Sequence, residues 1–304
     1  MSPNPKRRRL RTVARPLDSY VVYEGPSALD GAPIVAVLTG LLKASANSKT
    51  GAMAQLWILP AGDERPHEAQ ATGTDASVCG ACPLRPLEVA RARYAHALGL
   101  GPRPPAKACY VRTWQGPRAV YDAYQRGRYG ACNLRGALGA VALLGAPVRL
   151  GAYGDPSALP NRSNVVQGLC SAASSWTGYT HSWRAKPHQW LRRYCMASCE
   201  TTLDVLDAER LGWRAFVALD DTETVGRASW LALTHGKPRH GKEREAHTSA
   251  VNAKALALWG ARTTVGCPAV THVGQVTCAS CKLCNGTGGA KGSNVAHVLI
   301  SAHN

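Results

Sequence analysis

Four cysteines gather near the C-terminal end of this 304-residue sequence, in CPAVTHVGQVTCASCKLC. Cys278, Cys281 and Cys284 follow one another at C-x2-C-x2-C spacing, and Cys267 precedes them. Such spacing lets a short turn of backbone present several sulfurs to one ion or cluster, and four thiolates complete a tetrahedral shell. The pattern predicts a metal site that holds zinc or an iron–sulfur cluster, since both accept four thiolates. A set of buried cysteines without metal is the structural alternative.

A second cysteine group lies upstream, with Cys79 and Cys82 in SVCGACPLRP and Cys109 in KACYVRTW. Three thiols leave one ligand position to be filled, by Cys132, by a histidine such as His67, or by substrate. Three ligands with an open position are also typical of reactive metal sites. The group is therefore a candidate second metal site. The other cysteines stand among small and apolar residues, where a place in the core is expected: Cys170, Cys195 and Cys199.

The candidate catalytic residues follow apolar runs that read as strands. Asp155 stands between Gly154 and Pro156 in VRLGAYGDPSALP, where a turn could hold a catalytic carboxylate. His181, in GYTHSWR, could carry a proton, and Glu200, in MASCE, could act as a base. The structural alternatives are a plain Asp-Pro turn for Asp155 and a hydrogen-bonding role for His181. The rival carboxylates are Glu200 itself and the pair Asp220 and Asp221.

Short apolar runs alternate with helix-length segments along the chain. This alternation predicts a parallel sheet whose faces are covered by helices. About eight such units favour a (β/α)8 TIM-like barrel, with a doubly wound open sheet as the alternative. In either fold, chemistry belongs at the carboxyl ends of the strands. The predicted strands are 32–40, 54–60, 108–114, 148–154, 177–183, 194–199, 213–220, 263–269 and 296–303.

The domain organisation follows from composition. Residues 1–16 form a basic tail that we expect to be disordered until bound, and 17–304 form a single barrel domain with cysteine-rich insertions around 79–109 and 267–284. No stretch reaches the roughly 18 apolar residues of a membrane span, and the first residues lack a signal-peptide core. We therefore expect a cytoplasmic protein without a membrane partner. In that reducing compartment, thiols stay reduced or bind metal.

The net charge of +17 indicates a polyanionic partner, of which nucleic acid is the first candidate. A solvated basic face is the alternative for any single basic run. Arginine alternates with tryptophan and tyrosine in two of these runs, a mixture suited to phosphate contacts beside base stacking. The basic segments are 6–15, 112–130, 183–194 and 235–244.

Several motifs resemble a group of bacteriophage proteins related to the DpdA-type DNA 7-deazaguanine transglycosylases, within the tRNA-guanine transglycosylase superfamily. The resemblance covers nearly the whole chain and rests on GPSALDGAPIVAVLTG, NSKTGAMAQLWIL, VCGACP, ACYV, RLGAYGDPSALP, GYTHSWR and CASCKLC. It implies a barrel, a cysteine-bound zinc near the C-terminal end, and exchange of guanine in DNA for a 7-deazaguanine base. If the chain is phage-encoded, the location implied is the cytoplasm of the host cell.

Three departures from the tRNA enzymes stand out. The spacing here is C-x10-C-x2-C-x2-C, where theirs is C-x-C-x2-C followed by a distant histidine. The cysteine group at 79–109 is additional, and the chain is shorter. The zinc role therefore passes to Cys267, Cys278, Cys281 and Cys284 by their place in the chain, and the identity of the metal stays open.

The implied reaction begins with attack of a carboxylate, here Asp155, on the sugar C1′ of a guanosine nucleotide. Guanine leaves with help from a proton donor, and the incoming base resolves the covalent intermediate. A flipped or single-stranded nucleotide is required. The candidate substrate-binding residues are Ser27 and Asp30 before the first predicted strand, Tyr153, Tyr179 and Trp183 as stacking surfaces, and Arg184 as a phosphate contact.

Two other classes of function remain open. A non-catalytic zinc or iron–sulfur DNA-binding protein would also explain the charge and the cysteines. A metal-dependent nuclease would need several carboxylates gathered around Mg²⁺, and the sequence shows no convincing set.

Overall fold

The computed structural model describes residues 15–43, 47, 49–101, 108–219, 264–272, 274–287 and 297–301. Nearly all of the predicted N-terminal tail lies outside the described residues, as do the rival carboxylates Asp220 and Asp221 and the basic segment 235–244.

The first sheet has the strand order β1-β2-β3-β4-β5. Its first two pairings, β1 with β2 and β2 with β3, are antiparallel, whereas β3, β4 and β5 run parallel. The expectation of a purely parallel sheet was therefore wrong for this edge, and the strand β1 was not predicted. The strands are β1 (Tyr20–Pro26), β2 (Pro33–Thr39), β3 (Ala54–Pro60), β4 (Val148–Tyr153) and β5 (Trp176–Thr177).

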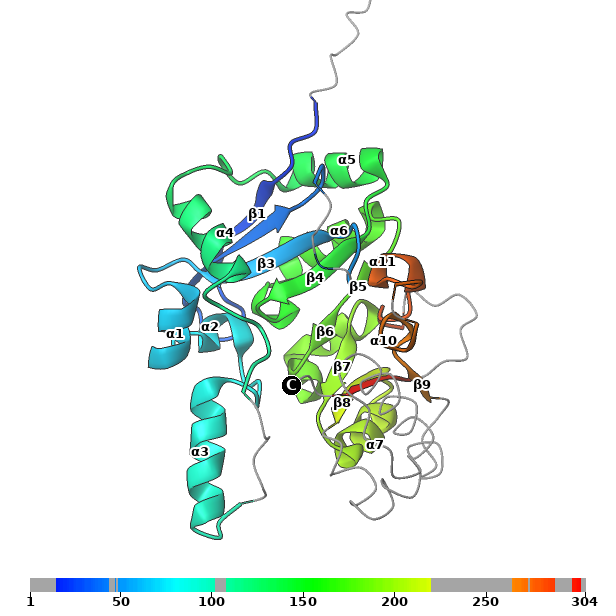
Figure 1. Ribbon diagram of the computed structural model, residues 1–304. Coiled ribbons are helices and arrows are strands. Elements are labelled where there is room, and N and C mark those ends of the chain that lie inside the picture. Colours follow the sequence, from blue (N-terminus) through cyan, green and yellow to red (C-terminus); the bar gives the residue numbers. More distant parts are fainter. Residues whose placement is uncertain are drawn as a thin grey trace, which may run out of the picture.

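The second sheet has the order β6-β7-β8-β10-β9, and its described pairings are all parallel. Only Gly178 separates β5 from β6, so one extended segment passes from the first sheet into the second (Figure 1). The Gly178 carbonyl accepts a hydrogen bond from Met196 N at 2.9 Å, which keeps this segment beside β7. The strands are β6 (Tyr179–Thr180), β7 (Met196–Cys199), β8 (Ala215–Leu219), β9 (Thr264–Gly266) and β10 (His297–Ser301).

Helices cover the sheets because each has an apolar side to bury. Helix α4 (Gly116–Gln125) contacts β3, α5 (Leu134–Leu144) contacts β1 and α6, and α6 (Val165–Ala172) contacts β4. Helix α7 (Thr202–Arg210) packs on β7 and β8. Burial of each large aliphatic side chain contributes about 1.5–3 kcal/mol. Fully buried members of the main core include Leu56, Ile58, Val141, Leu150 and Leu169.

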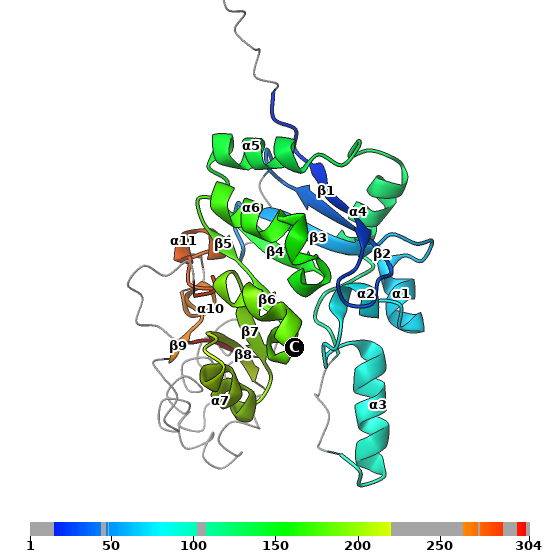
Figure 2. The same cartoon turned by 180° about the vertical axis from the view of Figure 1, so that it is seen from behind.

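Among the described residues, the remaining α-helices are short, apart from α3 (Pro86–Ala97), which stands away from both sheets (Figures 1 and 2). Of its twelve residues only Val89 is buried, so α3 is almost entirely a solvent-facing helix. The short helices are α1 (Pro66–Thr72), α2 (Ala76–Cys79), α10 (Pro268–Thr271) and α11 (Cys278–Cys281).

The mixed α/β class with parallel strands is confirmed. Residues 108–115, which include the predicted strand 108–114, instead form turns that lead into α4. Among the described residues, no helix has the length and apolar character needed to cross a bilayer.

Candidate functional site at the carboxyl ends of parallel strands

Asp155 directly follows β4, in a turn that glycine makes possible. Gly154 has φ 80°, and a Cβ there would lie 2.5 Å from the Ile58 carbonyl oxygen, so only glycine lets β4 approach β3 this closely. Asp155 then caps the 3-10 turn η1 (Pro156–Ala158), since its Oδ1 accepts a hydrogen bond from Ser157 N at 2.9 Å. The predicted turn is confirmed.

The Asp155 carboxylate also fastens β4 to β6. Oδ1 accepts a second hydrogen bond from Thr180 Oγ1 at 2.7 Å, and Oδ2 accepts one from His181 N at 2.8 Å. Asp155 is only 7% exposed. With two hydrogen bonds on one oxygen and one on the other, Oδ2 is the oxygen with more remaining capacity to accept.

His181 connects the end of β6 to the end of β7. Its Nε2 lies 2.7 Å from Glu200 Oε1, and the two side chains are about equally shielded, at 18% and 19% exposure. Burial lowers the pKa of His181, but Cys82 and Glu200 outweigh that effect and raise it well above its ordinary value. This raised pKa favours the protonated imidazole in its contact with the Glu200 carboxylate.

The upstream cysteine group meets this site. Asp155 N donates to the Val78 carbonyl at 2.6 Å, which places the C-x2-C turn beside the end of β4. Cys82 Sγ lies 3.8 Å from His181 Nε2, and Cys109 N donates to the Leu84 carbonyl at 2.6 Å. Burial, with a smaller contribution from the nearby Cys82, raises the pKa of Cys109 to about 11. Cys82 therefore contacts the histidine directly, and the segment that carries Cys109 lies against the same C-x2-C turn.

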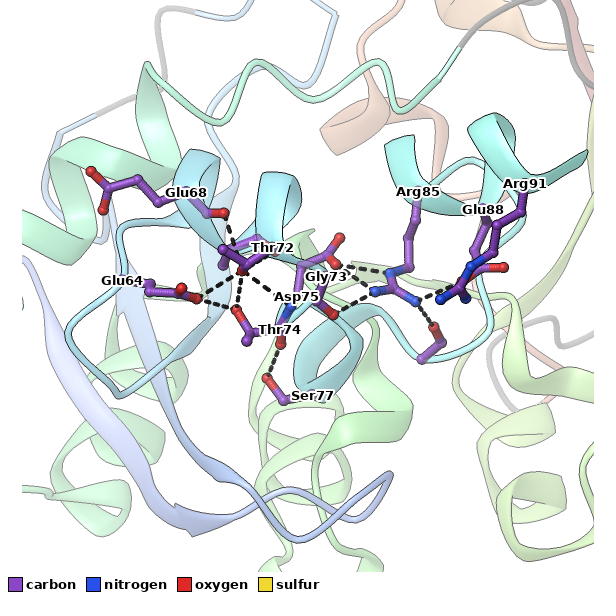
Figure 3. A network of polar contacts seen from close by, with 12 residues as sticks. Glu64, Glu68, Thr72, Gly73, Thr74, Asp75, Ser77, Arg85, Glu88 and Arg91 are labelled. Atoms are coloured by element: carbon purple, nitrogen blue, oxygen red, sulfur yellow. Dashed lines mark hydrogen bonds and ion pairs between the residues drawn. The ribbon is translucent and has the colours of Figure 1, made fainter. Parts of the chain in front are cut away.

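A buried ion pair holds the C-x2-C turn in place (Figure 3). Arg85 Nη2 donates to Asp75 Oδ1 at 2.6 Å and to the Gly73 carbonyl at 2.7 Å, while Nη1 reaches the Gly80 carbonyl at 3.2 Å. Both charged side chains are almost fully buried. Breaking such a pair by removing one partner typically costs about 3–5 kcal/mol. The turn therefore has a rigid support close to the strand ends.

The C-terminal cysteines lie elsewhere, on one face of the second sheet. Cys267, Cys278 and Cys284 belong to an apolar cluster with Met196 and Val298. Thr287 N donates to the carbonyl of Arg192 at 2.9 Å, near the end of the 3-10 helix η4 (Lys186–Arg193) that precedes β7. This group is thus anchored near the amino end of β7, away from the turn that carries Glu200.

Local structure brings the C-terminal thiols together. Thr277 caps the single turn of α11, and that turn places Cys278 and Cys281 three residues apart on one helix face. Lys282, at φ 58°, turns the chain so that Cys284 approaches them. Burial raises the pKa of Cys278 to about 11, with Cys267 and Cys281 adding to the effect.

Tyr179 serves this C-terminal group. Its ring packs on Phe216 at 4.4 Å between centroids, and its hydroxyl hydrogen-bonds the Cys284 thiol. A hydroxyl in this position would stabilise a metal-bound thiolate. Four thiols with such a donor fit zinc or an iron–sulfur cluster chemically. Within the described ranges, however, no group of three or more His, Cys, Asp or Glu side chains is arranged closely enough to hold a metal without adjustment.

Two predicted stacking residues do not fit that role. Tyr153 is 2% exposed and Trp183 is 1% exposed, because both rings pack into the main core. Trp183 Nε1 donates to the Ser198 carbonyl at 2.8 Å, which ties the turn after β6 to β7. Neither ring is accessible for stacking on a base, so both residues contribute to the core beneath the site.

The other substrate candidates also have local partners. Ser27 is buried and donates to the Ser77 carbonyl at 2.6 Å, so it braces α2. Asp30 is exposed, and its Oδ1 accepts from Ala32 N at 3.0 Å within a turn. Arg184 is half exposed, lies over the Trp183 ring and pairs with Asp204, so its phosphate role stays a prediction.

Exposed aromatic side chains lie on the segment after Cys109, partly within the predicted basic run 112–130. Tyr110 is 59% exposed and Trp114 is 60% exposed. Trp114 belongs to the basic run 112–130, and its neighbours Arg112 and Arg118 are also exposed. The mixture of arginine and tryptophan was visible in the sequence. The sequence did not indicate which of these aromatic rings are exposed to solvent.

Cys170, Cys195 and Cys199 are buried, as predicted. A cleft of about 370 Å³ contains none of the predicted site residues and is lined by Asp63, Arg65, Tyr121, Asp122, Gln125 and Arg126.

Comparison with protein-family models, with curated proteins and with solved structures gave no match.

Proposed function

We propose that this chain exchanges a guanine in DNA for a 7-deazaguanine base, as a pentosyl-transferring enzyme. The observation that carries the proposal is the link from Asp155 through His181 to Glu200. Two carboxylates are joined by one histidine where the strands β4, β6 and β7 end. Glycosyl transfer uses such a pair of carboxylates, one as nucleophile and one for proton transfer.

The roles follow from the hydrogen bonds. Asp155 Oδ2, with one hydrogen bond against two on Oδ1, is the oxygen that attacks C1′ of the sugar. The His181–Glu200 pair, at 2.7 Å, delivers the proton that it holds to the departing guanine and later accepts one from the incoming base. Because Asp155 is nearly buried, the nucleotide must leave the base stack to reach it.

The charge of +17 and the run 112–130, whose arginine side chains are exposed, support DNA as the partner. Trp114 takes the stacking role that Tyr153 and Trp183 cannot, and Arg112 and Arg118 supply phosphate contacts beside it. The proposal also includes closure of the two sheets into a TIM-like barrel. A zinc ion or an iron–sulfur cluster at Cys267, Cys278, Cys281 and Cys284 would support the sheet rather than react.

The test follows labelled guanine released from an oligonucleotide, or a 7-deazaguanine base entering it, with the purified full-length protein. Single- and double-stranded substrates are both needed, since the required nucleotide is extrahelical. Release that depends on Asp155 and Glu200 supports the proposal. Absence of exchange on every substrate, with a folded and metal-loaded protein, overturns it.

A second function, a non-catalytic zinc-containing DNA-binding protein, is favoured by one specific observation. Asp155 accepts three hydrogen bonds and is 7% exposed, which suits a purely structural carboxylate. DNA binding without base exchange, together with unchanged affinity in an Asp155 variant that still folds, would select this alternative.

A further inference from the structure

The upstream cysteine group contacts His181, and the proposed reaction does not use this contact. Cys79 is the last residue of α2 and Cys82 lies in the turn after it, while Cys109 comes from the segment before α4 and His181 from the turn after β6. The Cys82 to His181 contact of 3.8 Å joins residues 99 positions apart in the chain. Three thiols and one imidazole form a donor set typical of tetrahedral zinc.

We infer that Cys79, Cys82, Cys109 and His181 form a zinc site, distinct from the C-terminal cysteine group and adjacent to Asp155 and Glu200. The described side chains are not yet at ligand spacing, so binding must rotate them inward. Each thiol that binds gives its proton to solvent and becomes a thiolate. The inference does not rest on the proposed reaction, because metal content is measured without activity.

The backbone is already shaped for such a centre. Gly80 has φ 56° and ψ −135°, a conformation that only glycine adopts easily, and it folds the C-x2-C turn so that Cys82 N donates to the Cys79 carbonyl at 3.2 Å. The Arg85 side chain fixes the same turn through the Gly80 carbonyl at 3.2 Å. A ligand turn held by buried hydrogen bonds requires little reordering on binding.

Two buried polar atoms near Cys79 lack hydrogen-bond partners, and a metal centre would satisfy both. Asp75 Oδ2 and the Tyr153 hydroxyl are buried without a hydrogen bond of normal geometry. Leaving such groups unsatisfied costs about 1–3 kcal/mol each. A thiolate at Cys79 would accept a hydrogen bond from the Tyr153 hydroxyl, and the positive ion beside it would attract the Asp75 carboxylate.

The structure also discriminates among the possible fourth ligands. Cys132 is exposed and lies beside Glu24, while His67 lies on α1 near Glu68. His181 is instead in contact with Cys82 through the same nitrogen that faces Glu200. Zinc binding through this nitrogen would replace its contact with Glu200, so the orientation of Glu200 by His181 applies to the protein without zinc at this site.

The experiment measures zinc per chain in the full-length protein, purified under reducing conditions and dialysed against a weak chelator. A Cys278→Ser, Cys281→Ser, Cys284→Ser variant removes the C-terminal site and should retain about one zinc. Adding Cys82→Ser or Cys109→Ser should remove it. Matched controls in the same background are Cys132→Ser and His67→Ala, which should leave the content unchanged.

A second measurement does not require the C-terminal cysteines to be replaced. Cobalt titration of the wild type and of His181→Gln should differ in the ligand-field bands of one tetrahedral centre, and affinity at that centre should fall about tenfold or more. The inference is overturned if Cys82→Ser and Cys109→Ser retain the wild-type zinc content. Identical cobalt spectra for His181→Gln and wild type would remove His181 from the ligand set.

Discussion

The carboxylate of Asp155 accepts a hydrogen bond from the backbone N–H of His181 at 2.8 Å, so the turn that ends β4 is fastened to the turn that ends β6. These two turns belong to different sheets, and the chain passes from one sheet to the other through the segment that contains Gly178. The Asp155 side chain therefore fixes the turn that carries His181, and His181 in turn contacts Glu200 at the end of β7.

Asp155→Asn should abolish base exchange and also lower stability. The amide keeps one acceptor oxygen, but its NH2 group would face either His181 N or the donors Ser157 N and Thr180 Oγ1. In each case a buried donor is left unpaired, at a cost of about 1–3 kcal/mol. Loss of a covalent nucleophile should lower turnover by roughly 10⁴ or more. Urea unfolding and guanine release measure the two effects. Thr180→Val is the control, since it removes one hydrogen bond to Asp155 but leaves the carboxylate.

Glu200→Gln should lower turnover by about 10²–10⁴ while DNA affinity stays unchanged, because proton transfer is lost and phosphate contacts are not. His181→Ala should lower it by a similar factor, since Glu200 then loses the group that orients it. Single-turnover guanine release measures the chemical step. If Glu200→Gln retains full activity while Asp220→Asn is inactive, the catalytic carboxylate has been assigned to the wrong strand.

DNA binding should weaken by on the order of a hundredfold or more between low and physiological salt, because the protein displaces counterions from several phosphates. Deletion of residues 1–15, which carry six Lys or Arg side chains, should reduce the salt slope without abolishing binding. Fluorescence anisotropy over a salt series measures both. Salt-independent binding would argue against nucleic acid as the partner.

Trp114→Ala should weaken binding of single-stranded DNA by about tenfold or more, since one stacked base is worth roughly 1–3 kcal/mol. The salt slope should not change, because no charge is removed. Leu143→Ala is a matched control, as Leu143 is 63% exposed on α5 and carries no ring. Equal affinities for the two variants would remove Trp114 from the interface.

The Asp204 carboxylate should stabilise the protein near neutral pH and lose that effect in acid. It accepts hydrogen bonds from Thr201 N at 2.9 Å and Glu200 N at 3.1 Å, and it caps α7. Burial raises the pKa of Asp204, but the hydrogen bonds from Arg184 and Thr201 outweigh it and lower the pKa below its usual value.

A lowered pKa in the folded state means that this stabilisation is complete above the unfolded value, about 3.9, and falls as pH drops through the folded value. Asp204→Asn should therefore cost about 1 kcal/mol of unfolding free energy near pH 7 and less at strongly acidic pH. Urea denaturation at both pH values provides the measurement. A cost that grows on acidification would contradict the assigned role.

The C-terminal cysteines should hold about one metal per chain, and Tyr179→Phe should weaken its binding about 10- to 100-fold. The variant retains the ring that packs on Phe216 and loses only the hydroxyl that hydrogen-bonds Cys284. Metal analysis under anaerobic conditions, with chelator competition, tests this. A brown protein would indicate iron–sulfur rather than zinc, and unchanged affinity in Tyr179→Phe would show that the hydroxyl does not support the metal.

The sequence by itself determined the parts that depend on local order. Apolar runs and turn residues located most strands to within a few residues, and parallel strands share one carboxyl edge. Asp155, His181 and Glu200, each just past a strand, were therefore expected together and are found hydrogen-bonded in series. The antiparallel strand β1 was missed because β1, β2 and their turn carry no helix-length separation.

Only the tertiary structure decided which of the chemically capable residues face one another. Cys82 and His181 are 99 positions apart, and no periodicity links them, because their contact depends on how the turn after α2 folds against the end of β6. The same packing buries Tyr153 and Trp183 and leaves Trp114 in solvent. Residue type and spacing determine what chemistry is possible, whereas burial and long-range contacts determine which side chains are placed to perform it.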